Sequence, residues 1–201
     1  MVSLAHIWRH PLKSHGREAL QQVELTEGET MPWDRKWAVA HDASKVDGSQ
    51  WAPCANFSRG SKAPKLMAIT ATVNESTGIL TLSHPDLDDI AFDPDGDISD
   101  FLQWVTPLMP EDRAQSAKII RVEGVGMTDT PYQSISINSL SSLADLDSKI
   151  EQPMDQRRWR GNLWVEGLAP WVEFDWIGKT VQIGDVVFDV CDPVTRCLAT
   201  T

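Results

Sequence analysis

The chain has 201 residues, of which 41% are hydrophobic and 23% are charged, a composition typical of a folded globular protein rather than a disordered one. Acidic residues outnumber basic ones by 29 to 18, and the formal net charge of -11 argues against binding to nucleic acid or to an anionic membrane. The N-terminus lacks the apolar segment of a secretory signal, and no apolar run is long enough to span a bilayer. Three cysteines make no even disulfide framework. From these features we expect a cytoplasmic protein.

Short apolar runs that end in turn residues predict strands in the first half of the chain. A polar connection at residues 74–77 has the length of a hairpin turn. A short helix is predicted over residues 98–106, where Ile98, Leu102 and Val105 share a face and Pro107 ends the helix, and the acidic segment 86–100 is predicted to be a solvated loop. The predicted strands cover residues 5–9, 22–25, 36–40, 65–73 and 78–82.

The second half of the chain contains one clear helical pattern and one clear hairpin. Leucines at positions 140, 143 and 146 share a helical face with Ile150, and either Asn138 or Ser139 is placed to cap the helix. Residues 180–183 and 186–190 predict two antiparallel strands around a Gly-Asp turn. The patterns together predict two β-rich units joined near residues 110–135, with one or two helices.

Three basic clusters stand out in this acidic chain, while the usual catalytic motifs of hydrolases, zinc proteases and nucleotide-binding loops are missing. One interpretation is surface charge beside buried tryptophans; the other is a site for an anionic ligand, because arginine binds phosphate through two parallel hydrogen bonds and Ser or Asn completes the polar rim. His10 and His15, on either side of Lys13, are predicted to be solvated loop residues. The clusters are His10-Pro11-Leu12-Lys13-Ser14, Trp33-Asp34-Arg35-Lys36-Trp37 and Arg157-Arg158-Trp159-Arg160-Gly161-Asn162.

Cys197 near the end of the sequence allows two interpretations. A lone cysteine is commonly a small buried apolar side chain. As a thiolate it would instead ligate a soft transition metal or act as a nucleophile, with Thr195, Thr200 and Thr201 adding hydroxyl groups nearby. Spacing alone does not decide between these interpretations.

Five motifs, in the right order, resemble those of the MOSC family, which is named after the C-terminal domain of molybdenum cofactor sulfurase. The segment "HPLKS" is similar to a YPVKS-type signature, "WDRKW" to GDRxW, and "INSLSSLADLDSKI" to ILSEASLADLNSRL. The segment "RWRGNLWV" resembles RFRPNIVV, and "TRCLATT" resembles the S/T-R-C-x-x-T-T motif. Trp33 stands where the family has glycine, and Gly161 stands where proline is usual.

The resemblance implies a mainly β protein with a few helices, made of an N-terminal MOSC β-barrel-like domain over residues 1–110 and a MOSC β-barrel over residues 111–201. Because family members continue beyond the Thr-Thr pair, the second barrel is predicted to be truncated at its C-terminus. Unpaired strand edges then predict either a homodimer or a piece of a longer protein.

The resemblance also implies the molybdenum cofactor (molybdopterin), with Cys197 as the protein ligand to molybdenum and as the catalytic residue. At the level of the family it further implies pyridoxal phosphate binding. The residues that would bind the pterin and its phosphate are Lys13, Ser14, Arg35, Ser139, Arg158, Arg160, Asn162 and Thr195.

The activity implied by near relatives, among them the mitochondrial amidoxime-reducing component, is the reduction of small N-hydroxylated compounds. Three cysteines cannot hold a four-cysteine iron–sulfur cluster, so electrons would come from a separate ferredoxin- or flavin-type donor. The alternative is a carrier without redox activity that holds the cofactor, or sulfur as a Cys197 persulfide. A third hypothesis is a module that binds nothing.

Overall fold

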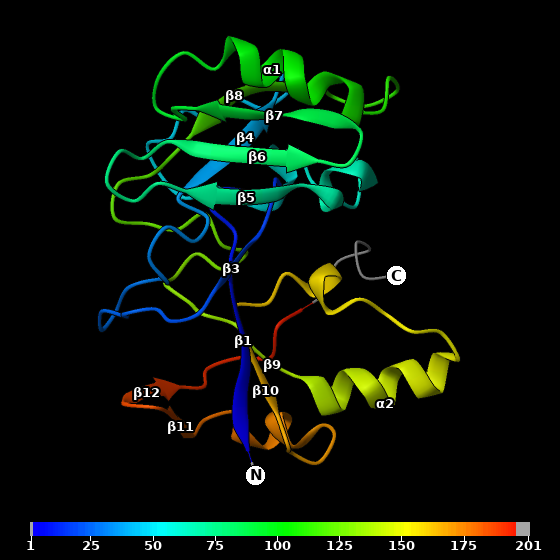
Figure 1. Cartoon of the computed structure of the whole chain (residues 1–201). Helices are drawn as coiled ribbons and strands as arrows, with labels where there is room; N and C mark the ends of the chain where they lie inside the picture. The colour runs from blue at the N-terminus through cyan, green and yellow to red at the C-terminus, as the bar shows by residue number, and fades with distance from the viewer. Residues whose placement is uncertain (1, 196–201) are drawn as a thin grey trace. The chain divides into compact units, whose positions relative to one another are not determined.

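The computed structural model describes residues 2–195, and its regular structure is mainly β (Figure 1). Among these residues there are twelve strands and two α-helices, linked by turns and 3-10 helices. The chain divides into two compact units, which are described separately. The larger unit comprises Arg9–Glu18 and Thr26–Ser134; the smaller unit comprises residues 2–8, 19–25 and those from 135 onward that the structure describes.

The larger unit contains two three-stranded sheets. In the first, β4 lies between a parallel neighbour, β2, and an antiparallel neighbour, β8; the second is an antiparallel sheet in the order β5-β6-β7. The helix α1 packs against β7 and β8. The elements are β2 (Leu12–Lys13), β4 (Trp37–His41), η1 (Cys54–Asn56), η2 (Pro64–Ala68), β5 (Thr70–Val73), β6 (Leu80–His84), β7 (Leu87–Phe92), α1 (Ser99–Val105), η3 (Thr106–Leu108) and β8 (Ser116–Ile120).

Strand β4 is buried on both faces, which explains its continuous apolar sequence. Trp37 and Val39 belong to the main hydrophobic core, whereas Ala38 and Ala40 belong to a second cluster on the other face. In the main core Phe101 of α1 stacks on Phe92 with ring centroids 4.8 Å apart. Because β2 is hydrogen-bonded to β4, the segment that contains Lys13 is anchored to this core.

The smaller unit has one four-stranded sheet in the order β3-β1-β10-β9 and a separate two-stranded sheet. Strand β1 is antiparallel to β10, β9 is parallel to β10, and β11 pairs with β12 as a hairpin. The elements are β1 (Ser3–Arg9), β3 (Glu18–Leu20), β9 (Ile137–Ser139), α2 (Leu140–Ile150), η4 (Gln156–Trp159), β10 (Leu163–Glu166), η5 (Val172–Trp176), β11 (Thr180–Ile183) and β12 (Val186–Asp189). Two elements, β1 and β3, extend by one residue into segments assigned to the larger unit.

Most of the predicted elements are confirmed, and the errors have physical causes. The helix predicted over 98–106 is α1, the one after Asn138 is α2, and both hairpins form. The strand predicted at 22–25 is wrong, since those residues are irregular, and residues 64–68 form a 3-10 helix rather than the start of a strand. The predicted loop at 86–100 contains β7, an edge strand whose exposed Asp88 and Asp89 conceal its pairing with β6.

Over residues 2–195, none of the helices has both the length and the apolar character that crossing a membrane requires.

Candidate functional site

The first two basic clusters lie side by side in the larger unit. Asp34 is only 2% exposed, and its Oδ1 accepts a 2.7 Å hydrogen bond from the backbone N–H of His10. Its Oδ2 accepts a hydrogen bond from the Arg35 Nη1. The Arg35 backbone N–H donates to the His10 carbonyl over 2.8 Å. A buried carboxylate therefore joins the segment before Lys13 to the segment that carries Arg35.

Lys13 is 6% exposed, and its ammonium group is fully hydrogen-bonded within the protein. Its Nζ donates to the carbonyls of Met127 at 2.7 Å and Thr128 at 3.1 Å and to the Asp129 carboxylate at 2.6 Å, which uses all three N–H groups of an ammonium ion. Burial lowers the pKa of Lys13, against the opposing effect of the Asp129 charge. Lys13 thus ties residues 127–129 to strand β2, which precedes Ser14.

Three of the predicted cofactor residues have left-handed backbones. The φ angles are 66° at Ser14, 50° at Arg35 and 49° at Arg160. Only six non-glycine residues in the described part of the chain have positive φ, so these three make up half of them. Such conformations cost free energy and concentrate at functional sites, where the surrounding structure maintains them.

Trp33 also has a left-handed backbone, with a φ of 65°. The MOSC motif that this segment resembles has glycine there, and glycine adopts positive φ without a steric penalty. The Trp33 indole ring lies 3.8 Å from the Lys36 ammonium and 5.8 Å from the Trp37 ring. These contacts stabilise a tryptophan in a backbone conformation that favours glycine.

The prediction that His10 and His15 are solvated loop residues is wrong. They are 1% and 0% exposed. The His10 Nδ1 lies 3.4 Å from the Asp34 Oδ1, and the His15 Nδ1 makes a 2.9 Å hydrogen bond with the Lys13 carbonyl. The His15 ring also contacts Phe101 edge-on. The short strand β2 draws both histidines into the core, a long-range effect that polar neighbours in sequence do not reveal.

Asn162, in the smaller unit, is 2% exposed and joins three segments. Its Oδ1 accepts from the Ser136 backbone N–H at 3.2 Å and from the Ser136 hydroxyl at 3.0 Å, while its Nδ2 donates to the Trp8 carbonyl at 3.1 Å. The Trp8 N–H in turn donates to the Asn162 carbonyl at 2.7 Å. The side chain holds the start of β10 against β1 and against the residue before β9.

Four other predicted cofactor residues, Ser139, Arg158, Arg160 and Thr195, belong to the smaller unit. Ser139 is buried and caps α2, where its hydroxyl accepts from the Ser142 N–H. Arg158 lies on η4, its Nη1 3.8 Å from the Met154 sulfur, and Arg160 is the left-handed residue that ends η4. Thr195 is exposed. Cys197, the predicted metal ligand, lies outside the residues that the structure describes.

Gly161, which follows Arg160, packs directly against the Asn138 side chain. An added Cβ would lie 1.8 Å from the Asn138 Nδ2, far closer than atoms approach. In this chain the Asn138 side chain occupies the space that a side chain at position 161, where the family motif has proline, would enter.

Two of the three cysteines lie among the described residues. Cys54 is half-buried, with its sulfur 3.3 Å from the Arg59 Nη1, and Cys191 is exposed; both are free thiols. No cluster of three or more His, Cys, Asp or Glu side chains able to hold a metal occurs within residues 2–195. The described side chains therefore offer anion-binding groups rather than a complete set of metal ligands.

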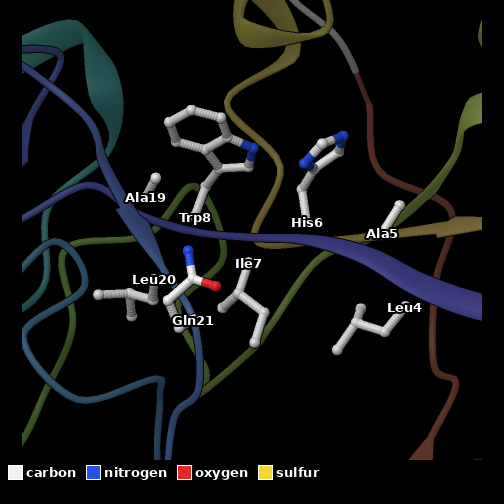
Figure 2. Close-up of a pocket in the computed structure, with 8 residues that line it drawn as sticks. All are labelled: Leu4, Ala5, His6, Ile7, Trp8, Ala19, Leu20 and Gln21. Carbon is white, nitrogen blue, oxygen red and sulfur yellow. The ribbon is translucent and has the colours of Figure 1, made fainter.

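A hollow of about 260 Å³ lies in the smaller unit along β1 and β3 (Figure 2). Its lining consists of residues 4–8 and 19–21, none of them a predicted cofactor residue. His6 and Trp8 extend from one side of β1 and Ile7 from the opposite side. The buried Trp8 indole N–H has no hydrogen-bond partner among the described residues.

Sequence reasoning missed Asp34 and the 127–129 segment. Asp34 lies inside the recognised "WDRKW" motif, but only the fold shows that its carboxylate is buried against His10. Met127, Thr128 and Asp129 carry no local signal, because two of their three contacts with Lys13 are made by backbone carbonyls, which every residue has.

Comparison with known families gives two matches along the chain. A model of the MOSC N-terminal beta barrel domain matches residues 1–112, and a model of the MOSC domain matches residues 126–201. No curated protein matches the sequence. The two family matches contain all five motifs described above.

Proposed function

The chain belongs to the MOSC family, whose domains are associated with molybdenum-cofactor-binding proteins, and on this premise we propose that it binds the molybdenum cofactor and reduces small N-hydroxylated compounds. The observation that carries the proposal is the conformation of Ser14, Arg35 and Arg160. All three are left-handed, polar or basic, and located within family motifs. Strained backbones at these positions, two in the larger unit and one in the smaller, support a ligand-binding role for the motif segments of each unit.

The residues fit an anionic cofactor in their chemistry. Arg35 and Arg160 supply planar guanidinium groups that match a phosphate, and the hydroxyls of Ser14 and Thr195 suit the polar rim of a pterin. Arg158 would add positive charge. Lys13, Ser139 and Asn162 would act mainly by fixing the segments that carry these groups, since each makes the hydrogen bonds within the protein described above.

Cys197 would be the protein ligand to molybdenum, because a thiolate is the side chain that a soft metal prefers. When bound, the cofactor would supply two-electron oxygen-atom removal, and the protein would supply the metal ligand, orientation and electrostatics. The overall reduction of an N–OH group consumes two electrons and two protons and releases water. A separate ferredoxin- or flavin-type protein would supply the electrons.

Turnover separates this function from a carrier role. The protein is purified from a host that makes the cofactor, its molybdenum is measured, and the oxidation of a reduced viologen dye is followed with and without a hydroxylamine-type substrate. Substrate-dependent oxidation by molybdenum-loaded protein supports the enzyme. Loaded protein without turnover would favour the cofactor or sulfur carrier instead.

Absence of both molybdenum and turnover would contradict the proposal. The same preparations are scanned for the absorption of pyridoxal phosphate, the other cofactor that the family suggests. Its presence in place of molybdenum would assign the basic residues to a different phosphate ligand.

A further inference from the structure

Asp34 is a buried carboxylate at the meeting point of two motifs of the larger unit. One oxygen accepts from the His10 N–H at 2.7 Å, and the other accepts from the Arg35 guanidinium. The His10 ring adds a nitrogen 3.4 Å from the first oxygen. Both oxygens of Asp34 therefore have donors, and one of these donors belongs to a residue proposed to bind phosphate.

Arg35 is held by its backbone as well as by its side chain. Its N–H donates to the His10 carbonyl at 2.8 Å, and its carbonyl accepts from the Met127 N–H at 2.7 Å. Its left-handed φ of 50° is thus fixed on both sides, and its side chain is 13% exposed. With the backbone fixed, the hydrogen bond to Asp34 restrains the direction of the guanidinium group.

The surroundings of the Asp34 carboxyl group favour its ionised form. Burial alone would raise the pKa of this carboxyl, but the Arg35 charge and the contacts with His10 hold the pKa well below its usual range. An ionised partner makes the stronger kind of hydrogen bond to a guanidinium. Arg35 therefore pairs with a carboxyl group whose surroundings favour the ionised form.

We propose that Asp34 is a positioning residue, which orients the Arg35 guanidinium for the phosphate of an anionic cofactor. This inference rests on the proposed function. Pre-orientation favours binding because the ligand does not have to order a flexible side chain on arrival. Among the contacts above, Asp34 is the acidic group that fixes a predicted phosphate-binding arginine.

The loss of the Asp34 charge and the loss of Arg35 orientation should change the phosphate affinity in opposite directions. Removing a negative charge next to a phosphate site should, by charge alone, strengthen anion binding. Loss of orientation should weaken it. Asp34→Asn retains an oxygen that can accept from the His10 N–H, but it presents an uncharged amide to Arg35. A weaker affinity in this variant therefore reports lost orientation, and a stronger one reports the charge effect alone.

The experiment is a double-mutant cycle with Asp34→Asn, Arg35→Ala and the double variant, and with Asp95→Asn as the control. Asp95 pairs with Arg121 at 3.0 Å and accepts from the Trp37 indole, so the control removes a more exposed aspartate–arginine ion pair from the same unit. Binding of inorganic phosphate to cofactor-free protein is measured by calorimetry. Molybdenum retained after gel filtration is the second readout, and thermal unfolding shows that each variant is folded.

We expect Asp34→Asn to weaken phosphate binding about tenfold, the effect of one charge-assisted hydrogen bond, and to lower molybdenum retention. In the Arg35→Ala background the same change should have no further effect, because residues that act through one another are not additive. Asp95→Asn should bind as the parent does. Unchanged or stronger binding in Asp34→Asn, or an equal loss in both backgrounds, would overturn the inference.

Two further outcomes are informative. Coupled phosphate effects in a parent that never carries molybdenum would support the role of Asp34 and contradict the proposed function. A parent that binds neither phosphate nor molybdenum would contradict both. Should Asp34→Asn fail to fold, NMR of the Arg35 guanidinium in the parent decides: restricted rotation supports the inference, and free rotation overturns it.

Discussion

Asn162→Ala should destabilise the smaller unit strongly. The substitution removes the three side-chain hydrogen bonds to Ser136 and to the Trp8 carbonyl, at distances of 3.0–3.2 Å, from a residue that is 2% exposed. Buried groups left without partners cost more than the net value of a hydrogen bond, so we expect a loss of about 2–4 kcal/mol in the free energy of unfolding.

The loss is measured by urea unfolding of cofactor-free protein, followed by tryptophan fluorescence and far-UV circular dichroism. The control is Asn56→Ala, because the half-buried Asn56 side chain makes an exposed hydrogen bond to the Pro53 carbonyl and accepts a 3.3 Å hydrogen bond from the Ser44 hydroxyl. This control should lose less than about 1 kcal/mol. A loss for Asn162→Ala no larger than that of the control would refute the view that Asn162 joins β1, β10 and the segment before β9.

Three more predictions follow from other residues. The pKa of Asp34 is lowered in the folded state, so its stabilising effect is complete above the ordinary aspartate pKa of about 3.9 and is lost as the pH falls below that value. The difference in unfolding free energy between parent and Asp34→Asn, measured from about pH 6 to pH 3, should therefore shrink by about 1.4 kcal/mol per pH unit below about pH 3.9. A constant difference would contradict the assignment. Gly161→Ala should lower the free energy of unfolding by about 1–3 kcal/mol, because the new Cβ meets the Asn138 side chain. In the control Gly96→Ala the new Cβ has no neighbour closer than 3.4 Å, so the unfolding midpoint should change little. Equal effects of the two substitutions would count against this packing. Arg160→Ala should weaken cofactor retention by about 1.5–3 kcal/mol, and Arg160→Lys should restore it in part. The control Arg157→Ala, which removes a guanidinium paired with Asp155, should retain molybdenum as the parent does. Equal molybdenum in all of these proteins would exclude Arg160 from the site.

The sequence predicted those parts of the fold that local patterns determine. The leucines at 140, 143 and 146 with a capping Ser139 are sufficient for α2, and the Gly-Asp turn is sufficient for the β11–β12 hairpin. The pairing of β1 with β10 could not be predicted from local patterns, because the paired residues Ile7 and Leu163 are separated by more than 150 positions in the sequence. Short strands such as β9 and the edge strand β7 carry too few alternating residues to be recognised.

The candidate site, too, was predicted only as far as local motifs identify its residues. Motif resemblance identified the segments that contain Ser14, Arg35 and Arg160, but not their left-handed backbones. It also gave no hint that Lys13 uses its N–H groups on residues 127–129 or that Asp34 is buried beneath Arg35. Such relations depend on contacts between distant segments, which only the folded chain brings together.

Molybdenum analysis of four proteins tests the central claim most directly. The parent, Cys197→Ser, Cys54→Ser and Cys191→Ser are purified from a cofactor-producing host, and molybdenum and pterin are measured per chain. We predict near-stoichiometric metal in the parent and in the Cys54 and Cys191 variants, and loss of metal and activity in Cys197→Ser, since an alcohol is a harder and far less acidic ligand than a thiol. Equal molybdenum in the parent and Cys197→Ser, or none in the parent, would contradict the account.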